Sequence, residues 1–102
     1  MQPLSSKERR ESSWRVVEGQ TLKWRCWSGD YAVFNPLSGQ THFLDIVTGK
    51  IVVLLISGSH SIVEMRASIS KFLDLPNDDK LAATIADILM RLEDVGLVEH
   101  LD

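Results

Sequence analysis

The sequence predicts an α+β fold in which a three-stranded antiparallel sheet comes first and three helices follow, in the order β-β-β-α-α-α. Three observations support this prediction. Residues 22–44 form three short segments of alternating, aromatic or β-branched residues, separated by turns that contain Gly or Pro. Residues 46–95 carry apolar residues at helical spacing, with capping residues before the runs. The 102 residues, 44% of them apolar, suffice for one two-layer domain.

The first strand is predicted at Leu22–Trp27, where residues of the two sheet faces alternate. Leu22, Trp24 and Cys26 share one face, so we expect Trp24 in the core and Cys26 to be a small buried hydrophobic residue. The other two strands are predicted at Tyr31–Asn35 and Thr41–Leu44, and the turns at residues 28–30 and 36–39.

Asp45 is a predicted N-cap, and the segment after it has two possible structures. Its Val and Ile content favours a strand, and Gly49 weakens a helix by about 1 kcal/mol. Apolar residues nevertheless recur at helical intervals at Val47, Ile51, Leu54 and Leu55. We therefore predict a buried helix over Ile46–Ile56.

Two further helices follow, and both have start signals. Ser61 and Glu64 fit a capping box, and residues 75–78 break the second helix and cap the third, predicted at Asp79–Val95. The expected apolar stripes are Ile62, Met65, Ile69, Phe72 and Leu73 in the second helix, and Leu81, Ile85, Ile88, Leu89, Leu92 and Val95 in the third. This helix-turn-helix pair on a small sheet predicts a winged helix-turn-helix fold.

The composition also predicts which residues form the folded domain and in which compartment the protein lies. Residues 1–13 are polar and predict a mobile tail, which leaves 14–102 as the domain. A single cysteine rules out a disulfide within the chain, and the N-terminus lacks a signal-peptide pattern. The longest apolar run, Ile51–Ile56, is too short to cross a membrane. We therefore expect a cytoplasmic protein without a membrane contact.

Three stretches resemble a known family. They are W-R-x-W-x-G-x-Y from Trp24, N-P-x-S-G-x-T-H-x-L-D from Asn35, and the closing R-L-E-x-x-G-L-V-E at Arg91–Glu99. In these stretches the chain resembles the PqqD-like family, and more narrowly the PqqD-type proteins of the HPr-rel-A system. The resemblance extends over about residues 14–99, and Gly49-Lys50 departs from the Ala- and Leu-rich helix expected there.

The resemblance implies a non-catalytic peptide chaperone, or RiPP recognition element. Such a domain would hold the leader of a ribosomally made precursor peptide and present it to a modifying enzyme. The peptide would add as a strand beside the third strand, in a groove against the third helix. An edge strand offers unpaired backbone groups for such pairing. The peptide-binding residues expected on this basis are Thr41, His42, Phe43, Leu44, Thr84, Asp87, Ile88 and Arg91.

The residues argue against several other functions and leave two alternatives open. His42, His60 and His100 lack the spacing of a zinc site, and no catalytic triad or phosphate loop is recognisable, so we expect no enzyme activity, metal or cofactor. A DNA-binding regulator is an alternative, but the acidic third helix and the net charge of −3 argue against a nucleic-acid partner. An adaptor that binds an HPr-kinase-related protein directly is another alternative. Edge-to-edge or strand-exchanged homodimerisation is compatible with the sequence.

Overall fold

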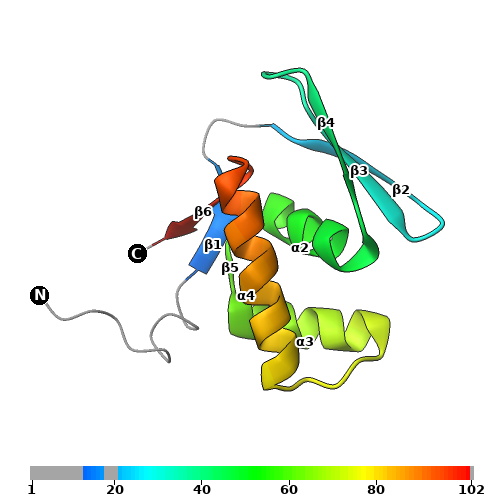
Figure 1. Cartoon of the computed structure of the whole chain (residues 1–102), viewed down its shortest axis with the longest axis vertical. Coiled ribbons are helices and arrows are strands. Elements are labelled where there is room, and N and C mark those ends of the chain that lie inside the picture. The colour runs from blue at the N-terminus through cyan, green and yellow to red at the C-terminus, as the bar shows by residue number, and fades with distance from the viewer. Residues whose placement is uncertain (1–12, 18–20, 102) are drawn as a thin grey trace, which may run out of the picture.

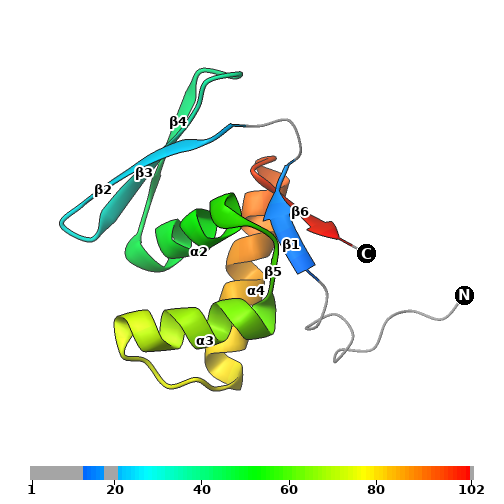
Figure 2. The ribbon, with the colours of Figure 1, turned by 180° about the vertical axis from the view of Figure 1, so that it is seen from behind.

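The computed structural model describes residues 13–17 and 21–101. The tail predicted at residues 1–13 lies outside the described residues, except for Ser13, which begins strand β1 (Ser13–Val16). Figures 1 and 2 show two small sheets on different sides of a helical layer. The predicted fold class, three antiparallel strands followed by three helices, is confirmed, and further short strands are added to it.

The larger sheet is the predicted meander, with the strand order β2-β3-β4. Its strands are β2 (Lys23–Trp27), β3 (Asp30–Asn35) and β4 (Gln40–Leu44), each within one residue of its predicted bounds. Ser28 and Gly29 join β2 to β3 with φ angles of 49° and 84°, the two positive values that a tight type I′ hairpin requires. This sheet projects from the body of the molecule as an arm (Figure 1).

Helix α2 (Ile46–Ser57) occupies the segment whose structure was ambiguous, and the helical prediction is confirmed. The Asp45 carboxylate caps it by accepting a hydrogen bond of 2.8 Å from the Thr48 backbone N–H. The helix packs on the face of the sheet that carries Tyr31 and Val33, both of which are buried. Burial against the sheet therefore outweighs the strand propensity of its Val and Ile residues.

Gly49 explains how α2 comes so close to the sheet. A Cβ atom at this position would lie 2.2 Å from Tyr31 Cγ and 2.6 Å from Tyr31 Cβ, so only glycine fits. The departure from the family pattern at this residue thus has a packing reason. Burial beneath the helix raises the pKa of Tyr31, and a side-chain hydrogen bond with Cys26 on the neighbouring strand raises it further.

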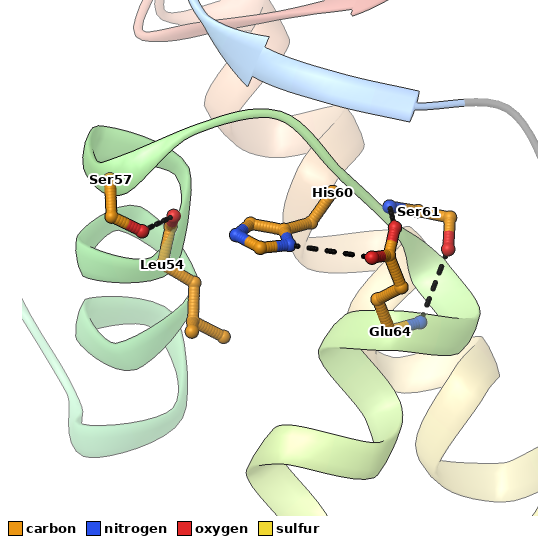
Figure 3. Close-up of polar contacts among 5 residues, drawn as sticks. All are labelled: Leu54, Ser57, His60, Ser61 and Glu64. Carbon is orange, nitrogen blue, oxygen red and sulfur yellow. Dashed lines mark hydrogen bonds and ion pairs between the residues drawn. The ribbon is translucent and has the colours of Figure 1, made fainter.

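Helix α3 (Ile62–Leu73) begins with the predicted capping box. In Figure 3, the Ser61 hydroxyl accepts a hydrogen bond of 3.2 Å from the Glu64 N–H, and Glu64 Oε1 accepts one of 2.9 Å from the Ser61 N–H. The bond from the Ser61 backbone, supported by the Ser61 side chain and by His60 at 3.8 Å, lowers the pKa of Glu64.

Helix α4 (Asp79–Asp94) follows a break at residues 74–78, which begins one residue before the predicted break at 75–78. The Asp78 carboxylate caps it by accepting a hydrogen bond of 3.0 Å from the Leu81 N–H. Its buried residues form the centre of the core together with α2 and α3: Leu81, Ala82, Ile85, Ile88, Leu89 and Leu92. Both predicted stripes were wrong at one residue near the helix end. In α3, Phe72 is exposed, and Lys50 Nζ lies 4.2 Å from the centroid of the Phe72 ring. In α4, Val95 is the C-cap and is also exposed.

The second sheet has the order β5-β1-β6 and joins segments that are distant in the sequence. Strand β1 pairs antiparallel with β5 (His60–Ser61) and with β6 (Val98–Leu101). Arg15 lies opposite Glu99, and their side chains form an ion pair of 2.7 Å. The pairing of these two distant segments was not predicted from the sequence.

Candidate functional site

The sheet register decides which residues of β4 face the helices. His42 and Leu44 lie opposite Val33 and Tyr31 of β3, so they share the face that α2 covers. Thr41 and Phe43 alternate with them and point to the other face. The four predicted binding residues of β4 therefore lie on two opposite faces of the sheet rather than on one.

The inner surface of β4 borders a hollow of about 240 Å³ beside α4. Residues from four neighbouring segments line it: His42, Leu44, Thr48, Ile88, Arg91, Leu92, Val95 and Leu97. Most of these side chains are apolar, and Arg91 contributes a positive charge without a carboxylate among the lining residues. A hollow of this kind can accept an aliphatic side chain and can hold an acidic group at its rim.

The structure brings half of the predicted site residues together and separates the others. His42, Leu44, Ile88 and Arg91 line the hollow, whereas Thr84 and Asp87 are exposed on α4 outside it. The Thr84 hydroxyl donates a 3.0 Å hydrogen bond to the Lys80 carbonyl of its own helix.

Sequence reasoning missed four lining residues. Thr48 is in the first turn of α2, Leu92 and Val95 were assigned to the core stripe, and Leu97 follows α4. The sequence signal for Leu92 and Val95 was their spacing from Ile88 on one helix face, which equally fits a core position.

The two edges of the larger sheet differ in character. Strands β2 and β4 are both edge strands, and β4 has no charged residue between Gln40 and Leu44. Strand β2 instead carries Lys23 and Arg25, and lysine or arginine on an edge strand opposes pairing with another strand. The β4 edge is therefore the less protected of the two and lies directly beside the hollow.

The outer face of the same sheet is exposed and aromatic. Trp27, Phe34 and Phe43 are 45%, 40% and 76% exposed, and they share this face with Lys23 and Arg25. Helix α2 packs against β3 and β4 on the opposite face.

Two predictions for β2 were wrong. Trp24 is 47% exposed rather than in the core, and Cys26 is an exposed free thiol rather than a buried residue. Both residues point to the inner face, but β2 lies beyond the reach of α2, so this part of the inner face has no cover.

Residues 13–17 and 21–101 contain neither a metal-ligand cluster nor a membrane-spanning helix. Within these ranges, no group of three or more His, Cys, Asp or Glu side chains is placed to hold a metal ion. In the same part of the chain, no helix is long and apolar enough to cross a membrane.

The fold and the hollow together define a winged helix-turn-helix domain with an open strand edge beside a helix. No family model and no curated protein sequence matches the chain. Among solved structures, the chain is similar to TbiB1 in complex with the TbiA(beta) leader peptide, with a TM-score of 0.65 and 18% sequence identity. The match covers 83% of this chain and 94% of that one. The fold that the PqqD-like resemblance implies is therefore confirmed.

Proposed function

We propose that this protein is a non-catalytic, peptide-binding accessory protein that holds the leader of a ribosomally made precursor peptide. The peptide adds as a fourth strand to β4, and its backbone pairs with the free edge of that strand. Alternate side chains of the peptide then face the hollow at His42, Leu44 and Arg91. The bound segment is presented to a modifying enzyme, which supplies the chemistry.

One observation carries this proposal, namely an uncharged edge strand that borders an apolar hollow against a helix. Backbone pairing alone does not distinguish peptides, but the hollow adds a pocket that selects side chains. The similarity to a structure solved with a leader peptide supports leader-peptide binding as the function. The binding residues proposed from the sequence, including Thr84 and Asp87, mark a wider surface around this groove.

DNA binding is less well supported by the same helix-turn-helix pair. The exposed side of α4 carries Asp87, Glu93 and Asp94 against Lys80 and Arg91. DNA-reading helices bring Arg, Lys, Asn or Gln to base edges, and phosphates repel carboxylates. Direct binding of an HPr-kinase-related protein without a peptide is the other alternative, and co-purification with and without the precursor separates it from our proposal.

The test is a titration of isotope-labelled protein with the leader of a short precursor encoded beside its gene. We expect NMR shift changes at Thr41–Leu44 and along the side of α4 that lines the hollow. Arg91→Ala should weaken binding by about 10- to 150-fold, since a charge-assisted contact is worth roughly 1.5–3 kcal/mol. Lys80→Ala is the matched control, because it removes an exposed cation of the same helix that lies outside the hollow. Shift changes confined to β2 or the β5-β1-β6 sheet would contradict the proposed mode.

A further inference from the structure

The outer face of the β2-β3-β4 sheet has opposite charges at its two ends. One shallow hollow on it is lined by Lys23, Trp24, Arg25, Trp27, Ala32 and Phe34, and contains two cations and no carboxylate. A second is lined by Trp27, Asp30, Tyr31, Phe43, Leu44 and Asp45, and contains two carboxylates and no cation. The rings of Trp27, Phe34 and Phe43 lie on the surface between and around these charges.

The strand register fixes where the charges are. Trp27 pairs with Asp30 at the hairpin turn, and Leu44, which precedes Asp45, pairs with Tyr31 near the same end. Lys23 pairs with Phe34 toward the opposite end, and Arg25 lies between. At about 3.3 Å per residue, Lys23 and Asp30 are separated by roughly 13 Å along the strands. The face therefore has a basic end and an acidic end.

Such a face is complementary to a second copy of itself. We propose that two copies of this chain associate through their outer sheet faces, around a two-fold axis that runs across the strands. This axis makes the facing strands antiparallel, so the basic end of one copy covers the acidic end of the other. The aromatic rings become buried between the two sheets.

Two alternative arrangements are less favourable. An axis along the strands would place Lys23 and Arg25 of both copies together, and like charges in contact oppose association. Pairing of two β2 edges would also bring cationic residues together, because Lys23 and Arg25 occupy that edge strand. The outer-face dimer leaves the hollow beside β4 open, since His42 and Leu44 point to the opposite face. If each hollow binds a peptide as proposed above, the dimer holds two peptides.

Sedimentation equilibrium of the full chain tests this proposal, under reducing conditions so that Cys26 cannot cross-link. From about 1 μM to about 1 mM, a range that covers weak to moderate dimers, the mass should rise from 11.5 kDa toward twice that value. Phe43→Thr should weaken association by about 10-fold or more, because Phe43 is the most exposed ring of the face. Phe72→Gln is the control, since it removes an exposed ring of α3 outside this face.

A charge-exchange experiment tests the arrangement itself. The Lys23→Glu/Arg25→Glu variant is acidic at both ends of the face, and Asp30→Lys reduces the acidic end, so each should associate less well alone than the original chain. An equimolar mixture of the two should form a mixed dimer, because their faces are then complementary. A monomer at every concentration, or a dimer that Phe43→Thr leaves intact, would overturn the proposal. So would a mixture that associates no better than its components.

Discussion

Replacing Gly49 with alanine tests how closely α2 lies against the sheet. In an open helix this change would add about 1 kcal/mol of stability, since alanine has the higher helix propensity. Here the new Cβ would lie 2.2 Å and 2.3 Å from Tyr31 Cγ and Cδ2, and 2.6 Å from Tyr31 Cβ. Rotation of the ring cannot relieve the last contact, because Tyr31 Cβ is attached to the backbone of β3. Either α2 or β3 must therefore move.

The size of the effect follows from these two opposing terms. Forcing extra carbon into a packed core costs about 1–3 kcal/mol. Tyr31 is 5% exposed and has no space to move into, so the upper part of that range applies. After subtraction of the propensity gain, we expect Gly49→Ala to lower the free energy of unfolding by about 1–2 kcal/mol. For a domain of this size, that corresponds to a fall in Tm of about 5–15 °C.

Urea denaturation followed by circular dichroism measures this difference. Ala83→Gly serves as the reference, because Ala83 is exposed within α4 and reports the glycine–alanine difference without a clash. A Tyr31→Ala background removes the two ring contacts, so Gly49→Ala should cost less there than in the original chain. If Gly49→Ala instead stabilises the protein by about 1 kcal/mol, the close packing of α2 on β3 is refuted.

Three further predictions concern the capping box, the core and β2. Because the Ser61 N–H lowers the pKa of Glu64 in the folded state, this carboxylate stabilises the fold above its ordinary pKa of 4.5, and the contribution is lost as the pH falls through the lower folded value. Glu64→Gln should therefore flatten the stability profile in that acidic range, and an unchanged profile in urea titrations would contradict it. Leu89→Ala should lower the free energy of unfolding by about 2–5 kcal/mol, because Leu89 is completely buried, and thermal denaturation measures the loss. Trp24→Thr should lower the free energy of unfolding by only about 0.5–1.5 kcal/mol, the value of an aromatic pair, since Trp24 is half exposed and its ring lies 6.0 Å from that of Tyr31; a loss above about 3 kcal/mol would place Trp24 in the core after all.

The local features of the fold could be predicted because their causes are local. Asp45, Ser61 and Asp78 each cap a backbone N–H three residues further along the chain, so the sequence alone contains both partners. The hairpin at Ser28 and Gly29 likewise depends on adjacent residues. Helix starts were correct, and strand bounds were correct to within one residue, for this reason.

The errors arose where distant segments decide the outcome. Alternation correctly put Trp24 and Cys26 on the face of Val33, but it could not tell that α2 covers only the β3 and β4 part of that face. The β1–β6 pairing was not predicted either, because Arg15 and Glu99 are 84 residues apart and no short-range pattern links them.

The candidate site was predictable only in part for the same reason. The edge strand and the residues at Ile88 and Arg91 followed from the sequence and the family resemblance. Thr48 and Leu97 join the hollow only because α2 and the end of α4 converge on β4. Whether Thr48 and Leu97 line the hollow depends on the packing angles between helices, and these angles cannot be predicted from residue periodicity.

The position of β1 beside β6 has a consequence for how this domain can be joined to others. Ser13 lies opposite Leu101, so the start of β1 and the end of β6 lie side by side in the small sheet. Figures 1 and 2 show this sheet on the other side of the molecule from the β2–β3 hairpin. A catalytic domain linked through either strand would be attached away from the arm and from the free edge of β4. The same architecture can therefore serve as a separate protein or as a module within a larger enzyme, without a change in the groove.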